Sequence, residues 1–326
     1  MELRKDPVTQ SWMLVGDEQP GIGRDSGGPC EWCAGGRLQA GRTVYVSPGG
    51  VRVYPHPHPL YQIEGTESRT GEGIYDRMRT VGAHEVVLES ATHDRQIVLA
   101  TDREAAEVLN TYGARLVDLK KDQRFRYVTV FKNRGKLAGE EFSHAHSQIT
   151  ATPFVPRRMV YELRASRTHY QSKERCVFCD IVQQEESRGT RVVEATANYL
   201  AMCPFAPRVP YELWVLPRYH AASFETDIAG RSGNGAGDVL ELAGILRRSL
   251  ARVEHITDAY HMVLHTTPNT STQRGVTVQW TTVADDYHWH FEILPIAEKR
   301  TRSYSIKEVY YCPVSPERAA EELRQA

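Results

Sequence analysis

The part of the sequence that decides the fold is residues 131–156, which read FKNRGKLAGEEFSHAHSQITATPFVP. A strand-like segment ends near Asn133 and leads through a glycine-containing loop into a second strand. Because side chains alternate along a strand, His144, His146 and Gln148 share one face of it. Three polar groups on one face of a half-apolar strand cost free energy unless they bind something. The alternative is a set of hydrogen-bonded core histidines.

Two motifs of this chain occur twice. His288-Trp-His290 follows His144-Ala-His146 at an interval of 144 residues. Cys176-x-x-Cys179 follows Cys30-x-x-Cys33 at an interval of 146 residues. Unrelated motifs that recur at nearly one spacing indicate an old duplication, and chance agreement of two short motifs is the alternative.

Strand-like and helical segments alternate along the chain. Runs rich in β-branched and aromatic residues predict strands at 95–100, 126–131, 147–152, 211–216, 262–265, 276–281 and 290–294. Helices are predicted at 105–119 behind a capping box of Thr101 and Glu104, at 238–253 and at 317–324, and a loop at 227–237. We therefore expect an α+β fold of two domains, residues 1–165 and 166–326, each a mainly antiparallel sheet with flanking helices.

Composition narrows the class of protein. The 326 residues carry a net charge of −1, so no basic excess indicates a nucleic-acid partner. No apolar run is long enough for a membrane span, and the polar start MELRKDPVTQ does not resemble a signal peptide. We expect a cytoplasmic protein without a membrane partner. Six cysteines are too few for a disulfide scaffold of this length.

The two Cys-x-x-Cys pairs are typical of metal sites in a reducing compartment. A tetrahedral zinc ion needs four nitrogen or sulfur ligands, so each pair requires two more from elsewhere. Spacing alone does not choose among the candidates His84, His93, His144, His146, His220, His261, His265, His288 and His290. A redox pair or an unbound pair of thiols is the alternative.

Further segments resemble the motifs of one protein family, and they follow one another along the chain in the same order as in that family. They are 2–9 (ELRKDPVT), 82–93 (GAHEVVLESATH), 131–156, 176–181 (CVFCDI), 214–220 (WVLPRYH), 287–295 (YHWHFEILP) and 313–324 (PVSPERAAEELR). Together with the cysteine pairs, they resemble the galactose-1-phosphate uridylyltransferase branch of the histidine-triad superfamily, which includes ADP-glucose phosphorylase-like members. The likeness covers most of the chain.

The resemblance implies the ligands that spacing leaves open. By the family pattern, one closed zinc site is formed by Cys30, Cys33, His93 and His144. A second site, with zinc or alternatively iron, is formed by Cys176, Cys179, His220 and His288. His84 is then a neighbour that does not bind the metal.

The resemblance also implies the catalytic residues. His146 matches the family nucleophile, and its second ring nitrogen should donate to a backbone carbonyl. Gln148 stands where histidine-triad hydrolases carry a third histidine. An amide can donate a hydrogen bond to a phosphoryl oxygen but cannot transfer protons at neutral pH, which favours a transferase over a hydrolase.

Other positions imply substrate contacts or depart from the family. Asn133, Gly135 and Gly139 match the loop around the nucleotide phosphates, and Lys299 and Tyr304 match positions near the second substrate. Glu141 replaces a small hydroxyl residue that faces the phosphate, and His56 replaces an asparagine. A carboxylate there is repulsive unless a cation intervenes, for which the candidates are Arg134, Lys136, Arg157 and Arg158, or unless the loop turns it away.

The resemblance therefore implies a nucleotidyltransferase with ping-pong kinetics. By default it moves UMP between a nucleoside diphosphate sugar and a sugar 1-phosphate through a nucleotidyl-histidine. The alternative is a phosphorylase that uses inorganic phosphate on ADP-sugars or dinucleotides, and a nucleotide-binding module without turnover is a third reading. A homodimer is expected from the family alone.

Overall fold

The computed structural model describes residues 1–16, 29–231, 237–270, 280–296 and 310–326. Its strands are β1 (Glu2–Lys5), β2 (Trp12–Val15), β3 (Tyr45–Val46), β4 (Arg52–Pro55), β5 (Thr70–Glu72), β6 (Tyr75–Arg79), β7 (Ala83–Leu88), β8 (Tyr127–Arg134), β9 (His146–Thr152), β10 (Val192–Ala195), β11 (Tyr199–Met202), β12 (Leu213–Pro217), β13 (Tyr260–His265) and β14 (His290–Pro295). The α-helices are α1 (Asp102–Leu119), α2 (Arg157–Lys173), α3 (Val177–Arg188), α4 (Phe224–Arg231), α5 (Gly237–Ile256), α6 (Val283–Asp286) and α7 (Pro316–Gln325). Two short 3-10 helices, η1 (Ile97–Leu99) and η2 (Lys136–Ala138), complete the order.

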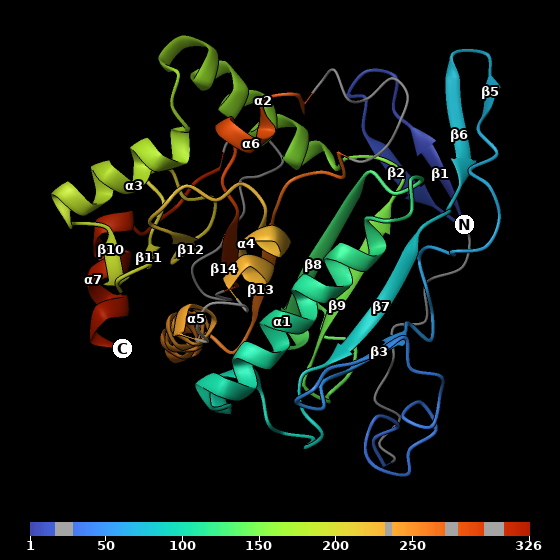
Figure 1. The fold of residues 1–326 in the computed structure, drawn as a ribbon, viewed down its shortest axis with the longest axis horizontal. Coiled ribbons are helices and arrows are strands. Elements are labelled where there is room, and N and C mark those ends of the chain that lie inside the picture. Colours follow the sequence, from blue (N-terminus) through green and yellow to red (C-terminus); the bar gives the residue numbers. More distant parts are fainter. Residues whose placement is uncertain (17–28, 232–236, 271–279, 297–309) are drawn as a thin grey trace.

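One large sheet carries both His-x-His strands (Figure 1). Its ten strands lie in the order β10-β11-β12-β14-β13-β8-β9-β7-β4-β3, and the pairs between them are antiparallel. A separate four-stranded sheet, β2-β1-β6-β5, stands beside it. The α+β class and the mainly antiparallel sheets are as predicted.

The strand order supports the duplication inferred from the motifs. Counted inward from each outer edge, the first half reads β3, β4, β7, β9, β8 and the second half reads β10, β11, β12, β14, β13. The two His-x-His strands, β9 and β14, therefore occupy equivalent places. The halves join where β8 pairs with β13, so two predicted sheets form one. The predicted boundary at residue 165 falls inside α2, and the division into two domains stays a proposal.

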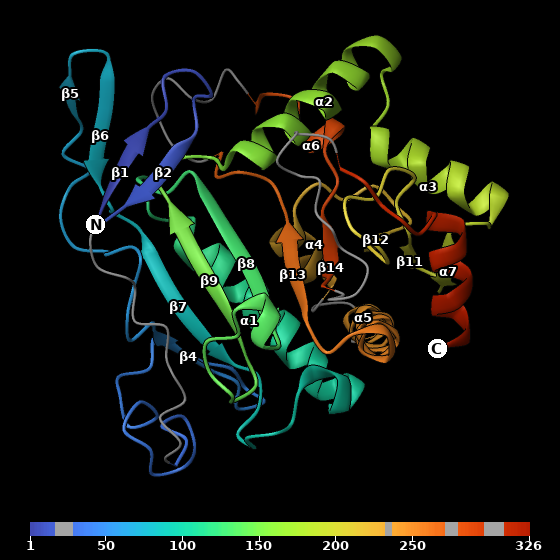
Figure 2. The same ribbon diagram turned by 180° about the vertical axis from the view of Figure 1, so that it is seen from behind.

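Each face of the large sheet has its own core. On one face, Leu109 and Leu116 of α1 pack with Val128 and Val130 of β8. Figure 1 shows α1 in front of β8 and β9, and Figure 2 shows the same strands from the opposite side. The other face belongs to a second cluster that contains residues of α2, α3, β11 and β12, among them Leu163, Phe178, Leu200 and Leu216. Alternation of side chains along the strands produces these two layers.

Most of the predicted elements are present. The capping box at α1 is formed, since Thr101 accepts from the backbone of Glu104 while the Glu104 side chain accepts from the backbone of Thr101. The strand predicted at 95–100 is wrong: residues Ile97–Leu99 form η1 directly before the cap of α1. The loop predicted at 227–237 is partly wrong, because α4 runs to Arg231. Most of the strand predicted at 276–281 lies outside the described residues.

Within the described ranges, every helix is too short or too polar to cross a lipid bilayer.

Candidate active site and metal centres

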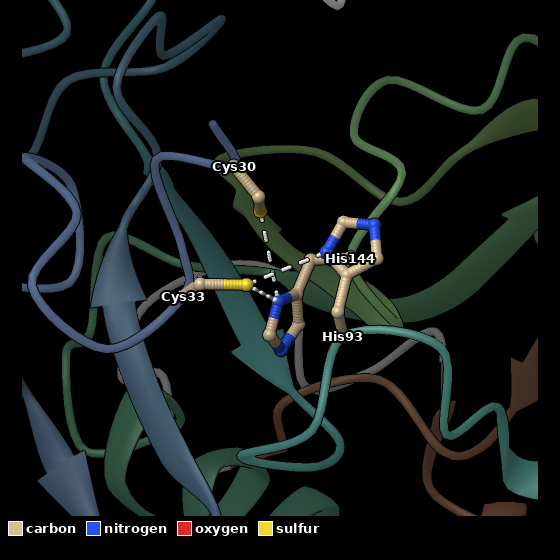
Figure 3. A group of neighbouring side chains, drawn as sticks. All are labelled: Cys30, Cys33, His93 and His144. Carbon is tan, nitrogen blue, oxygen red and sulfur yellow. Dashed lines mark hydrogen bonds between the residues drawn. The ribbon is translucent and has the colours of Figure 1, made fainter. Parts of the chain in front are cut away.

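The first predicted metal set converges on one point (Figure 3). The side chains of Cys30, Cys33, His93 and His144 place their sulfur and nitrogen atoms within 4.8 Å of one another. The Sγ of Cys33 lies 3.4 Å from Nδ1 of His93 and 3.7 Å from Nδ1 of His144. Zinc bonds of about 2.3 Å to sulfur and about 2.0 Å to nitrogen put ligand atoms about 3.6 Å apart in a tetrahedron. The cluster therefore has the dimensions of a closed zinc site.

Hydrogen bonds prepare the imidazole of His144 for this role. Its Nε2 lies 2.9 Å from the carbonyl oxygen of Ser90, to which Nε2–H donates. Nδ1 is then unprotonated and faces the two sulfur atoms. A ligand histidine that donates its other N–H to a carbonyl is the usual arrangement at metal centres. Cys30 and Cys33 come from one tight turn, in which the Cys33 N–H donates to the Cys30 carbonyl.

The second predicted set repeats this geometry in the other half. The ligand atoms of Cys176, Cys179, His220 and His288 lie within 4.8 Å of one another. Cys179 Sγ is 3.5 Å from Nδ1 of His220 and 3.7 Å from Nδ1 of His288. His220 and His288 both donate Nε2–H to backbone carbonyls, of Ala284 and Pro217 respectively. The donor set of two thiols and two imidazoles again fits zinc.

His146 lies at the start of β9, two residues after a member of the first metal set. Its Nδ1–H donates to the carbonyl of His144 over 2.8 Å, which is the hydrogen bond expected from the sequence. The lone pair is therefore on Nε2, and no described residue donates a hydrogen bond to that atom. Burial lowers the pKa of His146 to about 3, and the ammonium of Lys132 acts in the same direction. The imidazole is neutral at pH 7 and has a defined tautomer.

A buried lysine supports the main chain of this residue from the other side of the sheet. Lys132 Nζ donates to the carbonyl of His146 over 2.8 Å and to Glu89 over 2.9 Å. The register of β8 with β9 ends at the pair Phe131 and Gln148, so Lys132 contacts the carbonyl just beyond the paired residues. The side chains of Lys132 and Glu89 are each only 1% exposed.

Gln148 is held at both ends of its amide. Its Oε1 accepts from Nε2–H of His84 over 2.8 Å, and its Nε2 donates to Oε2 of Glu141 over 3.2 Å. The backbone N–H of Leu60 donates to Nδ1 of His84, which fixes the tautomer of that ring. His84 thus lies outside the metal set, as the resemblance implied, but it orients the amide of Gln148. The sequence pattern did not reveal this contact.

Glu141 points toward this group and not away from it. Its Oε2 accepts from Nε2–H of His56 over 3.0 Å, and the rings of His56 and His84 are stacked with centroids 4.0 Å apart. The two positions where the chain departs from the family are therefore in direct contact.

Three of the cations considered for Glu141 have other partners in the described part of the chain. Arg134 pairs with Glu140, Arg157 contacts Tyr161, and Arg158 pairs with Glu292. Among the described residues, Glu141 instead contacts His56, whose Nε2 lies 3.0 Å from Oε2.

The predicted loop residues lie between β8 and β9. Gly135 has a φ of 84°, and a Cβ there would lie 2.5 Å from the carbonyl oxygen of Asp258, so packing alone requires glycine. Gly139 has a φ of 72° and open space where a Cβ would be. Asn133 Oδ1 accepts from Nδ1–H of His261 over 2.9 Å. The predicted substrate contacts Lys299 and Tyr304 lie outside the described residues.

A third group of ligand-type side chains was missed from the sequence. Glu162, His265, His290 and Glu292 place their polar atoms within 4.8 Å of one another in the interior of the second half. The alternation His288-x-His290-x-Glu292 was a signal for part of it. Glu162 could not be assigned, because α2 was not predicted as a helix.

Two cavities of about 950 Å³ and 880 Å³ lie elsewhere on the described surface. The second is lined by Trp32 and Ser90, which neighbour the first metal set, but neither cavity is lined by His146 or Gln148. His146 is 2% exposed, and the ring of Phe142 stands edge-on to it with centroids 5.2 Å apart. Phe142 therefore contributes to the burial of the His146 ring.

Comparison with known proteins gives the relationships of the chain. A family model described as the N-terminal domain of galactose-1-phosphate uridyl transferase matches residues 61–156. The galactose-1-phosphate uridylyltransferase of Thermotoga maritima is 25% identical over 100% of this chain and 98% of its own length. The ADP-glucose phosphorylase of Arabidopsis thaliana is 24% identical over 99% of this chain and 92% of its own length.

Solved structures agree with these relatives. A uridylyltransferase structure superimposes with a TM-score of 0.80 at 26% identity and covers 100% of this chain and 98% of that one. The Arabidopsis thaliana ADP-glucose phosphorylase with bound ADP-glucose has the same fold, with a TM-score of 0.76 at 24% identity over 100% of this chain and 99% of that one. Over nearly its whole length the chain is thus similar to galactose-1-phosphate uridylyltransferases and to an ADP-glucose phosphorylase.

Proposed function

We propose that the protein transfers a nucleoside monophosphate between two phosphorylated partners through a covalent intermediate on His146. The observation that carries the proposal is the hydrogen bond from Nδ1–H of His146 to the His144 carbonyl. It leaves the Nε2 lone pair of a neutral ring available to attack phosphorus. A nucleophilic imidazole splits one difficult exchange of phosphates into two easier displacements.

Both displacements occur at one phosphorus atom. In the first, Nε2 attacks the α-phosphorus, a P–N bond forms, and the bond to the bridging oxygen of the leaving phosphate breaks. The ring then carries a positive charge, which the His144 carbonyl stabilises through Nδ1–H. In the second, an oxygen of the acceptor phosphate attacks the same phosphorus, the P–N bond breaks, and the neutral imidazole returns. This sequence predicts ping-pong kinetics.

Gln148 would act on the phosphoryl oxygens. One N–H of its amide is committed to Glu141, and the other is available to a ligand. Since His84 occupies Oε1, the amide cannot rotate to present its oxygen to the phosphate without losing that bond. An amide transfers no proton at pH 7, which suits an intermediate that waits for a second phosphate and not for water.

The substrate pair follows from the family. The default implied by the resemblance is transfer of UMP between UDP-glucose and galactose 1-phosphate, and relatives named galactose-1-phosphate uridylyltransferase support it. The second candidate is phosphorolysis of an ADP-sugar with inorganic phosphate, favoured by the relative named ADP-glucose phosphorylase. Asn133, Gly135 and Gly139 are proposed to lie around the nucleotide phosphates, and Lys299 and Tyr304 near the second substrate.

Zinc is proposed at both closed sets of two cysteines and two histidines, with iron as the alternative at the second. Four protein ligands leave no open position for a substrate, so the metal would stabilise the fold and brace the main chain before β9 and β14. A homodimer in the cytoplasm and two domains of one plan, residues 1–165 and 166–326, stay predictions from the resemblance and the repeat.

Isotopic labelling tests the proposal. The protein is incubated separately with UDP-glucose and ADP-glucose, each labelled at the α-phosphate, and then precipitated. Acid-labile, base-stable label on the wild-type chain and none on His146→Gly is the expected result, and the labelled substrate identifies the base. Retained label on His146→Gly would refute the assigned nucleophile. Chase with galactose 1-phosphate or inorganic phosphate then separates the two substrate pairs.

A further inference from the structure

Two neighbouring carboxylates in the loop before β9 have different surroundings. Glu140 accepts from the backbone N–H of Gly135 and from Arg134, so it braces the loop. Glu141 is not paired with a lysine or arginine of the described chain, and its Oε2 accepts from His56 and Gln148. No described residue donates to its Oε1, and the side chain is 16% exposed. One carboxylate oxygen is therefore available to a ligand.

The group formed by His56, His84, Glu141 and Gln148 carries a negative charge. The backbone N–H of His58 donates to Nδ1 of His56 over 3.0 Å, so that nitrogen is unprotonated and the ring is neutral. Burial lowers the pKa of His84 to about 4, so this ring is neutral at pH 7 as well. Burial alone would raise the pKa of Glu141, but the hydrogen bond from His56 and its neighbours lower it below the usual value. The carboxylate is therefore ionised and uncompensated.

This charge lies beside the reacting centre. Gln148, which binds Glu141, shares a strand face with His146 two residues away. The rings of Phe142 and His146 are in edge contact, so the residue after Glu141 lies against the nucleophile. A second phosphate placed against Glu141 would be repelled, because like charges in a partly desolvated site repel strongly. Hydroxyl groups meet no such penalty and form strong hydrogen bonds to an ionised carboxylate.

We propose that Glu141 is a subsite for sugar hydroxyl groups of the nucleotide sugar. This inference rests on the proposed function and adds a specificity-determining residue to it. Hydroxyl donors can come from the ribose or from the hexose of the same substrate, and their chemistry toward Glu141 is identical. His56 and His84 position this subsite: His56 donates to the carboxylate, and His84 holds the amide of Gln148 so that one of its N–H groups donates to Glu141.

The test compares substrates that lack single hydroxyl groups. The nucleotide sugar that labels His146 is supplied intact, as its 2′-deoxy and 3′-deoxy ribose analogues, and as analogues deoxygenated at hexose positions 2 and 3. The rate of labelling at low substrate concentration gives kcat/KM of the first displacement. We expect the wild type to react at least about 30-fold more slowly with one ribose or one hexose analogue, because a charged hydrogen bond is lost. The analogue affected identifies which sugar contacts Glu141.

Variants assign the effect to this side chain. Glu141→Ala should slow labelling by the intact substrate about 30-fold. Its labelling rates with the deoxy analogues should lie within about 3-fold of its rate with the intact substrate, because the hydrogen-bond acceptor is gone. Glu141→Gln keeps the shape of the side chain, and its labelling rate should lie between those of the wild type and Glu141→Ala. Glu140→Gln, the matched control, should keep the wild-type discrimination. Metal content and melting temperature are measured for each variant to confirm that it is folded.

Other outcomes overturn the inference. Equal rates for all analogues in the wild type, or discrimination that persists in Glu141→Ala, would exclude a hydroxyl subsite at this residue. Labelling that requires added Mg²⁺ in the wild type but not in Glu141→Ala would show that a cation bridges the carboxylate and a phosphate instead. Absence of label on His146 from any nucleotide sugar would refute the proposed function itself, whereas normal labelling without discrimination would refute only the hydroxyl subsite.

Discussion

The strands β9 and β14 each start at the second histidine of a His-x-His motif with the same local geometry, but this histidine is neutral in β9 and positively charged in β14. In each motif the first histidine belongs to a Cys/His set, and its carbonyl accepts from Nδ1–H of the second, His146 or His290. Burial holds the pKa of His146 at about 3. Burial would also lower the pKa of His290, but the carboxylates of Glu162 and Glu292 reverse the effect and raise it to about 10.

The difference lies in what faces Nε2. In β14 this atom lies 3.2 Å from Oε1 of Glu162, which α2 brings across the sheet face. In β9 no helix of the described ranges supplies a carboxylate to the equivalent atom, and the polar neighbour on the strand is an amide, Gln148, in place of Glu292. A protonated imidazole has no lone pair and cannot attack phosphorus. The motif therefore places a histidine, and its neighbours decide whether it is a nucleophile or a buried cation.

The largest expected effect contrasts the two histidines directly. His146→Gly should reduce nucleotidyl transfer by more than about 10⁴-fold, since the covalent route disappears. His290→Asn should label at a rate within about 10-fold of the wild type per folded chain. Rapid-quench measurement of labelled protein gives both rates. Equal losses in the two variants would contradict the division of roles between β9 and β14.

The two Cys/His sets should also differ in their link to activity. Cys33→Ser loosens the set whose His144 carbonyl fixes the tautomer of His146, so labelling should fall about 100-fold. Cys179→Ser should lower the melting temperature while labelling stays within about 10-fold of the wild type. Zinc content by mass spectrometry accompanies both measurements. A full zinc complement in both variants would argue against these cysteines as ligands.

The charge on His290 should appear in the pH dependence of stability. Its pKa is about 10 when folded and about 6.5 when unfolded, so its stabilisation is fully present below pH 6.5 and is lost as the pH rises toward 10. The wild type should therefore lose about 2 kcal/mol of its advantage over His290→Gln between pH 6.5 and 8.5. Urea unfolding at both pH values measures this. An advantage that is independent of pH would mean that His290 is uncharged.

The smallest expected effect concerns Gln148. Gln148→His introduces a group that can transfer protons next to the phosphorus, so hydrolysis of the intermediate should rise about 10-fold. The measurement is release of free nucleoside monophosphate from prelabelled protein without acceptor. Gln148→Asn, which cannot transfer protons, is the control. If both variants release the nucleotide equally fast, the amide acts only by position.

The cysteine pairs stand out in the sequence, but only the family resemblance selected the histidines whose ligand atoms the structure brings within 4.8 Å of them. The role of His146 as nucleophile stays a prediction. The tautomer of His146 could also be predicted, because it depends on a hydrogen bond to a carbonyl only two residues away. The partners of Gln148 could not be predicted, because His84 and Glu141 reach it from another strand and a loop. Glu162 was missed for the same reason: α2 shows only a weak apolar stripe, and its carboxylate meets β14 through tertiary packing.

One local prediction failed for a different reason. Residues 95–100 have the β-branched composition of a strand, but the cap at Thr101 fixes the start of α1 immediately after them. The chain has no room for a paired strand there, so Ile97–Leu99 coil into η1 and bury Ile97. Composition alone does not show that a neighbouring helix cap takes precedence.

The junction of β8 with β13 has a consequence for the ancestry of the chain. These strands pair from Tyr260 with Arg134 to Leu264 with Val130, and neither is at an outer edge. A half-length ancestor with β8 at its margin would have exposed unpaired amide and carbonyl groups, which a second identical molecule could satisfy. Fusion of two such molecules would have made that association permanent, which freed one copy of the histidine strand to take up a charged structural role.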